Sequence, residues 1–415
     1  MNDVFLIGAF TTPFARFPEV SFQALAAQAV EGVQRDAGLA TLEGLGSVHF
    51  GNCAMHVFGQ ANIRGQVALT PLLQRGALPR NTPIINVEGG CATGSLALHG
   101  AFLAIASGGA RLALAVGVEK TFVPDAAKLM SIFDQGIDQL APDAWRAHFA
   151  AHAPACGVPF EPSPARILML DVCALQAGWH MKTWGTTQEQ LAFGASKNHA
   201  HGAKNPNAQY RKEMSVAEVL ADKPVLGPFT RSMCAPISDG AAATLLCSAA
   251  HLETLPEETR RRALRLRTVT LAGGAPRGPG EESVTAVAAR RAFAAAGLRP
   301  RDVDVAEVHD ATSFAELAAV EALGFVKAGE GGPYVASGAT ALGGERPVNT
   351  SGGLVSKGHP LGATGLAMVH ELALQLRGEA GARQVADAKV AVAENAGGLL
   401  TFDEALCAIS VLTRP

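Results

Sequence analysis

Cys91 is the residue whose type and position in this chain most clearly suggest chemistry. It follows Gly89 and Gly90, between a short strand predicted for residues 82–88 and a nearly uncharged helical segment at 92–106. A thiol in the first turn of a helix faces unpaired N–H groups and the positive end of the helix dipole, which favour the nucleophilic thiolate. The alternative is a structural cysteine, because free cysteines are often buried. The two glycines and the helix start favour the nucleophile.

His359 occupies a similar position in the second half of the chain. A glycine-rich loop at 349–365 leads into a helical segment at 366–376, and a strand is predicted at 389–394. Because a helix, a break and a strand also follow Cys91, the sequence predicts an internal duplication. If the halves pack about a pseudo-twofold axis, the imidazole can meet the thiol and remove its proton. A helix-capping or buried structural histidine is the alternative.

Composition restricts the class of protein. The 415 residues are 48% hydrophobic and 17% charged, with 45 glycines, which is typical of a large α/β core with many tight turns. With 34 basic and 37 acidic residues, nucleic-acid binding is not indicated. The seven cysteines include no CxxC pair, so we expect no metal site, no disulfides and a cytoplasmic location. No segment is long and apolar enough for a membrane span.

The order of predicted elements divides the chain. Strands and helices alternate over residues 1–120 and resume after an insertion, and a charged connection at 252–262 separates the two halves. The insertion at 121–232 holds all three tryptophans, proline-rich turns and a basic, histidine-bearing stretch. We therefore predict an N-terminal half at 1–250 that carries this insertion as a lid, and a C-terminal half at 263–415.

Seven short segments carry a family resemblance, and they lie at residues 59–64, around Cys91, and at 117–120, 234–243, 309–316, 348–353 and 358–365. Together and in this order they resemble the thiolase superfamily, most closely the sterol-carrier-protein-type and lipid-transfer-type thiolases. The resemblance covers nearly the whole chain, although any single glycine-rich segment would be a weak signal. It implies an α/β fold of five layers, αβαβα, built from two similar halves. It also implies a loop domain that covers coenzyme A, and a homodimer or a dimer of dimers.

The resemblance assigns roles to residues at matching positions. Cys91 is expected to take the acyl group from a thioester, and His359 is expected to remove its proton. One set of oxyanion donors would be the Cys91 N–H with an N–H of the loop Asn395, Ala396 and Gly397; the other would be His309 and His359, directly or through water. Three further motif residues are open between a catalytic and a loop-holding role: Asp310, Asn349 and Ser351.

The chain departs from the family at the second active-site cysteine, which moves the substrate α-proton in many thiolases. The corresponding positions hold Glu394, before the C-terminal glycines, and Ala311, two residues after His309. Glu394 and His309 are the candidates for this proton transfer, with His56 as a further one. The alternative for Glu394 is a carboxylate that braces the glycine loop.

These residues predict a thiolase-type acyl-CoA acyltransferase of fatty acid or aromatic acid degradation. It would cleave a 3-oxoacyl-CoA with coenzyme A, or condense acyl-CoAs, through an acyl-Cys91 intermediate. Coenzyme A is expected as a co-substrate, with no bound cofactor. Four basic residues of the insertion are candidates for its phosphates, although a solvated basic face is the alternative: Lys182, Lys197, Arg211 and Arg231.

Two other functions stay open at this point. The first is a thiolase-like aldolase or lyase that acts on a CoA thioester with a small OB-fold partner protein, and the presence of Cys91 argues against it. The second is a non-catalytic lipid- or CoA-binding subunit. Such a subunit would be expected to lack Cys91, His309 or His359, and all three are present. An OB-fold partner is also compatible with the acyltransferase.

Overall fold

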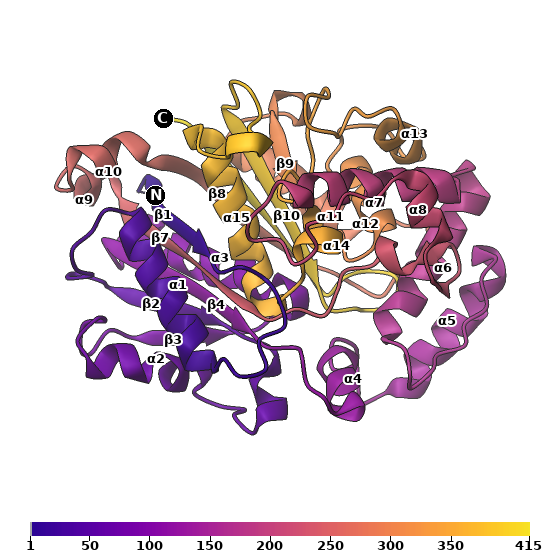
Figure 1. Cartoon of the computed structure of the whole chain (residues 1–415), viewed down its shortest axis with the longest axis horizontal. Coiled ribbons are helices and arrows are strands. Elements are labelled where there is room, and N and C mark those ends of the chain that lie inside the picture. The colour runs from indigo at the N-terminus through magenta and orange to yellow at the C-terminus, as the bar shows by residue number, and fades with distance from the viewer. Residues whose placement is uncertain (1) are drawn as a thin grey trace.

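The computed structural model describes residues 2–415, and its main sheet has nine strands in the order β3-β2-β4-β7-β1-β8-β11-β10-β9 (Figure 1). The first group comprises β1 (Val4–Thr11), β2 (Ser47–Gly51), β3 (Ile84–Val87), β4 (Leu112–Glu119) and β7 (Gly240–Ser248). The second comprises β8 (Leu264–Gly273), β9 (Val305–Glu307), β10 (Val390–Gly397) and β11 (Leu406–Thr413). Phe5 pairs with Arg265 and Leu6 with Leu264, which joins the two groups through β1 and β8.

The two groups of strands repeat one topology. In the first, β2 and β4 are parallel, and β4, β7 and β1 then follow as antiparallel neighbours. In the second, β9 and β10 are parallel, and β10, β11 and β8 are antiparallel in the same way. The edge strand β3 has its counterpart in an isolated parallel bridge between Ala306 and Val348. The predicted duplication is therefore confirmed.

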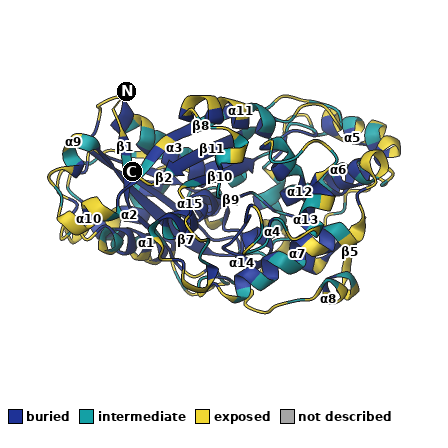
Figure 2. Cartoon of the chain, turned by 90° about the horizontal axis from the view of Figure 1, so that it is seen from above, coloured by how far each residue is buried: buried dark blue, intermediate teal, exposed yellow. Residues whose placement is uncertain are grey.

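Two helices fill the space between the groups, and other helices cover the outer faces. The central pair is α3 (Thr93–Ala106) and α15 (Leu361–Arg377), which share one core with the inner faces of both groups. The helices α1 (Phe22–Asp36) and α2 (Arg64–Gln74) cover the first group, and α11 (Val284–Ala296) and α12 (Ser313–Ala322) cover the second. This order gives the five αβαβα layers, and Figure 2 shows the buried sheet at their centre.

Residue type explains why the central layer forms. β4 is buried along its whole length, and its nearly continuous apolar run is typical of a strand covered on both faces. The helix α3 has no charged side chain, and α15 is buried at most of its positions. Burial of such helices on several sides is the main favourable contribution to folding.

The chain between β4 and β7 leaves the sheet and forms a separate group of helices. These are α4 (Ala126–Asp134), α5 (Pro142–Cys156), α6 (Leu168–Trp184), α7 (Gln188–Ala203) and α8 (Val216–Ala221), with a small sheet of β5 (Pro224–Leu226) and β6 (Phe229–Thr230). The helix α7 packs on α12, α13 (Gly331–Ala336) and α14 (Gly353–Lys357). The insertion therefore lies over the C-terminal half, as Figure 1 shows at the right.

The structure differs from the sequence-based prediction at some boundaries. The helix predicted at 366–376 begins earlier, because α15 starts at Leu361 with Pro360 as its N-cap residue. The charged connection at 252–262 is largely helical, in α9 (Ala249–Leu252) and α10 (Glu257–Arg262). Within residues 2–415, no helix combines the length and the apolar character that a membrane crossing requires.

Candidate active site

The Cys91 turn is tight and largely buried. Cys91 lies in the 3₁₀ turn η2 (Gly90–Ala92), just before α3 rather than in its first turn. Gly90 has φ +56°, and a Cβ there would lie 2.7 Å from the backbone nitrogen of Gly398, so glycine is required. Burial and, after it, the neighbouring Cys173 thiol raise the pKa of the Cys91 thiol to about 12, although the N–H of Cys91 itself opposes this shift. The helix start therefore does not lower the pKa of the thiol, and the thiol needs a base, the role that the sequence analysis expected of His359.

A hydroxyl group fixes one ring nitrogen of His359. Its Nδ1 lies 2.8 Å from Thr364 Oγ1, and that hydroxyl donates to the carbonyl of Pro360 at 3.0 Å. Because the Thr364 proton is already used, Nδ1 must donate to Oγ1, and the lone pair of the imidazole is on Nε2. Burial, the His309 ring and Lys357 hold the pKa of His359 well below its usual value. The ring is therefore a neutral base.

His309 completes the group from the loop between β9 and α12. Its Nε2 lies 3.4 Å from Nε2 of His359, and burial lowers the pKa of His309 to about 4. The Sγ of Cys91 and a ring nitrogen of each histidine all lie within 4.8 Å of one another. The two helices that the duplication makes equivalent therefore bring the thiol and the imidazole together, as the sequence predicted.

Glu394 lies next to this group on β10. Its Oε2 accepts the backbone N–H of His309 at 2.9 Å, and its Oε1 lies 3.4 Å from the hydroxyl of Thr285. Burial raises the pKa of Glu394 to about 7, although the His309 N–H opposes this shift. The carboxyl group both braces the His309 loop and lines the cavity described below. Near neutral pH it can give or accept a proton.

The glycine loop after Glu394 touches the Cys91 turn. A Cβ on Gly397 would lie 2.7 Å from the nitrogen of Cys91 and 2.4 Å from that of Ala92, so only glycine allows this approach. Ala396 and Gly397 face the cavity. The side chain of Asn395 points elsewhere, since its Oδ1 accepts from Ser95 at 2.9 Å.

A cavity of about 590 Å³ leads from the Cys91 group toward the insertion. Its walls are mostly apolar and come from α4, α6 and α12, with the loop after β10. Side chains that line it include Phe133, Met169, Leu170, Cys173, Trp179, Phe314, Ala315, Ala318, Leu399 and Phe402. Such a cavity with a few polar groups at one end is typical of a small-molecule site.

Known proteins share both halves of this chain. "Thiolase, N-terminal domain" matches residues 4–142, and "Thiolase C-terminal domain-like" matches residues 280–409. An acetyl-CoA acetyltransferase of Methanothermobacter thermautotrophicus is 37% identical over 408 residues, which cover 96% of this chain and 97% of that relative. The chain belongs to the thiolase family. Sterol carrier protein 2 of Bos taurus is 36% identical to this thiolase over 407 residues, 95% of this chain and 70% of that protein.

Solved structures share the fold of this thiolase. The "Ltp2-ChsH2(DUF35) aldolase" has a TM-score of 0.75 at 20% identity, and the match covers 100% of this chain and 98% of that one. The Acat5 thiolase of Ascaris suum, solved in complex with coenzyme A, has a TM-score of 0.67 at 19% identity, with 100% of both chains covered. At these identities the likeness concerns the fold.

The basic candidates of this thiolase do not line the cavity. Lys182, Arg211 and Arg231 are exposed, and Arg231 pairs with Asp222 at 2.9 Å. Lys197 is largely buried, donates to Glu316 at 2.6 Å and is not free to bind a phosphate. His56 also lies outside the cavity lining, where its Nδ1 is 2.8 Å from the carbonyl oxygen of Cys53.

Asp310, Asn349 and Ser351, whose roles the sequence did not decide, hold loops of this thiolase. Asp310 accepts the N–H of Leu354 at 2.6 Å and the Asn198 amide at 2.8 Å. Asn349 accepts the N–H of Val308 at 2.8 Å. The backbone N–H of Ser351 donates to buried Glu307 at 3.0 Å. These contacts fix the segments before and after the histidine loops, which is a positioning role.

Sequence reasoning missed two residues that position the site. Thr364 sets the tautomer of His359, and its place one helical turn after Pro360 was the available signal. Glu119 accepts N–H groups of Cys53 at 2.9 Å and Gly362 at 3.1 Å, which links β4 to the start of α15. A carboxylate at the end of an otherwise apolar strand was the signal there.

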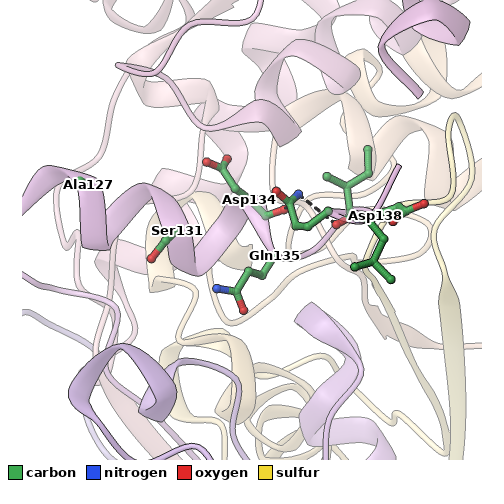
Figure 3. A pocket seen from close by; sticks show the side chains of 8 residues that line it. Ala127, Ser131, Asp134, Gln135 and Asp138 are labelled. Carbon is green, nitrogen blue, oxygen red and sulfur yellow. Dashed lines mark hydrogen bonds between the residues drawn. The ribbon is translucent and has the colours of Figure 1, made fainter. Parts of the chain in front are cut away.

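A second hollow lies on the surface by α4 and the turn after it (Figure 3). Its lining includes Ser131, Asp134, Gln135 and Asp138. The described residues of this lining include no histidine, cysteine or basic side chain, so the hollow lacks the thiol and imidazoles of the Cys91 group.

Proposed function

We propose that this thiolase is an acyl-CoA acyltransferase that works through an acyl-Cys91 intermediate. It would cleave a 3-oxoacyl-CoA with coenzyme A, or condense acyl-CoAs in the reverse direction. The observation that carries this proposal is the approach of Cys91, His309 and His359 within 4.8 Å at one end of the cavity. Coenzyme A is the co-substrate, and the reaction needs no bound cofactor.

The first half of the cleavage forms the acyl-enzyme. As the Cys91 sulfur attacks the 3-oxo carbon, its proton passes to Nε2 of His359, which carries the free lone pair. The alkoxide that forms lies near two groups of donors, the backbone N–H groups of Cys91 and the Gly397 loop and the ring of His309. Loss of one such donor typically costs roughly 3–4 kcal/mol of transition-state stabilisation.

The second half releases both products. The bond between C2 and C3 breaks, the acyl group stays on the sulfur, and the enolate of the shortened acyl-CoA takes a proton at C2. The proton on His359 then passes to the group that protonated C2, so that the ring is neutral again. The thiol of coenzyme A attacks the acyl-Cys91 carbonyl, His359 takes its proton, and the ring gives this proton to the leaving sulfur, which restores the thiol of Cys91. In the condensing direction each step is reversed.

We assign the C2 proton transfer to Glu394, which replaces the second cysteine of other thiolases. Its pKa of about 7 leaves both forms populated at neutral pH, and it lines the cavity beside His309. His309 is the alternative donor, but burial lowers its pKa to about 4, so it carries little of the proton at neutral pH.

A partial-reaction experiment tests the assignment of Glu394. Glu394→Gln keeps the shape of the side chain and is expected to lower cleavage of acetoacetyl-CoA by about 10²–10⁴-fold, the usual size of a general acid–base contribution. Acylation of Cys91 by acetyl-CoA needs no C2 proton and should stay near the parent rate. Equal losses in both reactions would contradict the assignment.

The insertion at 121–232 is proposed to cover coenzyme A as a loop domain, between halves at 1–250 and 263–415. Its helix α6 lines the cavity, and exposed Lys182, Arg211 and Arg231 stay candidates for the phosphates. The apolar walls fit acyl groups of fatty or aromatic acid breakdown. We further propose a cytoplasmic homodimer or dimer of dimers.

Replacement of the nucleophile tests the main proposal. Wild-type protein mixed with acetyl-CoA should gain the mass of one acetyl group, and Cys91→Ser should lose both this adduct and turnover. Cys173→Ser, which changes another thiol of the same cavity, should still be acetylated. Turnover by the Cys91→Ser protein at the wild-type rate would rule out Cys91 as the nucleophile.

The aldolase stays the second candidate, because the neighbour with a TM-score of 0.75 is an aldolase complex. An aldolase would form no acyl-enzyme, and its cleavage of a 3-hydroxyacyl-CoA would depend on an OB-fold partner. Co-purification of the native protein with such a partner, followed by the same mass measurement, separates the two. A non-catalytic subunit would give neither an adduct nor cleavage.

A further inference from the structure

The Cys91, His309 and His359 group has the composition of a metal site. One thiol and two imidazoles are a ligand set that Zn²⁺ commonly uses, with a fourth position left to water or substrate. The three residues are far apart along the chain, so the cysteine spacing predicted no such site. Only the approach of α3 and α15 with the His309 loop brings them together.

The distances fit one tetrahedral ion. Zn–N bonds of about 2.0–2.1 Å at the tetrahedral angle put two nitrogen ligands roughly 3.3–3.4 Å apart. The two Nε2 atoms are 3.4 Å apart. A Zn–S bond of about 2.3 Å puts the sulfur roughly 3.6 Å from each nitrogen. The observed separations are at most 4.8 Å, so the sulfur has to approach the nitrogens by no more than about 1.2 Å to reach this geometry.

The two imidazole rings can offer nitrogen lone pairs to a metal ion. A neutral imidazole has one nitrogen lone pair, and neutral imidazoles are common metal ligands. Thr364 accepts the Nδ1 proton of His359, which directs Nε2 toward the sulfur and is the kind of second contact that orients metal-binding histidines. The adjacent Glu394 carboxyl group can offset the added positive charge.

An ion can also reach the group. All three residues line the cavity of about 590 Å³, which connects them with the space in front of the insertion. The described residues with thiols in this lining are Cys91 and Cys173. Cys173 therefore provides a matched control, since it lies in the same cavity but outside the ligand group.

We propose that Cys91, His309 and His359 bind one Zn²⁺ ion reversibly and that the bound ion blocks acyl transfer. Binding forms one Zn–S and two Zn–N bonds, and the thiol proton is released to solvent, with no change in oxidation state. While the ion is bound, the nitrogen lone pair of His359 is used in the Zn–N bond, so the ring cannot act as the base, and the zinc-bound sulfur is a weaker nucleophile than the free thiolate. The blocking rests on the proposed function, but the binding does not.

Co²⁺ titration tests the binding without any activity measurement. Reduced, chelator-treated full-length protein is titrated with Co²⁺, and one equivalent should give visible d–d bands of a tetrahedral site with a thiolate-to-cobalt charge-transfer band. Added Zn²⁺ should remove both signals. Cys91→Ser should abolish the charge-transfer band, and His309→Ala should weaken Co²⁺ binding by at least about tenfold. Cys173→Ser should give the wild-type spectrum.

The outcomes separate the two proposals. A charge-transfer band that survives in Cys91→Ser, or that disappears in Cys173→Ser, would overturn the site. Because any variant can fail to fold, thermal unfolding of each is compared with wild type, and the two histidines serve as independent tests of the site. Cobalt binding at Cys91 in a protein that never forms an acyl-enzyme would instead contradict the proposed function. Acetylation of Cys91 that Zn²⁺ stops and a chelator restores supports both.

Discussion

Thr364→Val is the change that most directly tests how this thiolase prepares its base. The Thr364 hydroxyl is buried completely, accepts the Nδ1 proton of His359 at 2.8 Å and donates to Pro360 at 3.0 Å. Valine has nearly the same volume and shape but cannot accept a proton. The change therefore removes one hydrogen bond of the base and leaves the packing of α15 intact.

The size of the effect follows from the buried N–H. A buried donor left without a partner costs about 1–3 kcal/mol. This cost applies only to the tautomer with the proton on Nδ1, so the population with a lone pair on Nε2 falls by about 5- to 150-fold. The rate of Cys91 acylation should fall by about the same factor. The KM for acyl-CoA should change little, because Thr364 is not part of the cavity lining.

The assay is single-turnover acetylation of Cys91 by acetyl-CoA, followed by intact mass at short times. Thr364→Ser is the matched control, since it keeps the hydroxyl and loses only a methyl group. It should acylate within about threefold of wild type, although the small cavity left behind costs roughly 1 kcal/mol of stability. Thermal unfolding of both variants checks that the fold is kept.

Two results would refute this reasoning. Acylation by Thr364→Val at the wild-type rate would mean that the hydroxyl does not set the tautomer of His359. An equal loss in Thr364→Ser and Thr364→Val would attribute the effect to packing.

Two further predictions concern the loop beside the nucleophile and an ion pair far from it. Gly397→Ala should push the loop off the Cys91 turn, cost about 1–3 kcal/mol of stability and slow acetylation strongly, as measured by unfolding and intact mass. Burial alone would raise the pKa of Asp36, but Arg377 and Arg262 outweigh it and lower the pKa. Since the folded pKa is depressed, the stabilisation is present above about pH 4 and is lost as the pH falls through the folded pKa. Asp36→Asn, which leaves the buried Arg377 unpaired, should cost about 3 kcal/mol at pH 7 and progressively less in acid, as denaturant unfolding at several pH values would measure.

The local sequence pattern was enough to predict most helices and strands of the fold. The apolar runs at 82–88 and 389–394 predicted β3 and β10, and the uncharged segment at 92–106 predicted α3 within one residue. β10 and most of α3 are buried, so their residue types are restricted by packing, whereas β3 is a partly exposed edge strand. Pro360 marked the start of α15 within one residue, but the glycines after it look like a loop in the sequence, whereas in this fold they lie in the helix and pack against other backbone.

The sequence by itself determined the duplicated fold and the absence of the second cysteine, and it predicted Cys91 as the nucleophile and His359 as the base, because each of these depends on residue type and local order. Only the tertiary structure decided the ionisation of these groups. Burial keeps the Cys91 thiol protonated, keeps both histidines neutral and brings the pKa of Glu394 to about 7. The protonation of a group depends on the solvent and charges around it, and residues distant in sequence supply both. The same holds for the metal-binding geometry, which exists only where three distant segments meet.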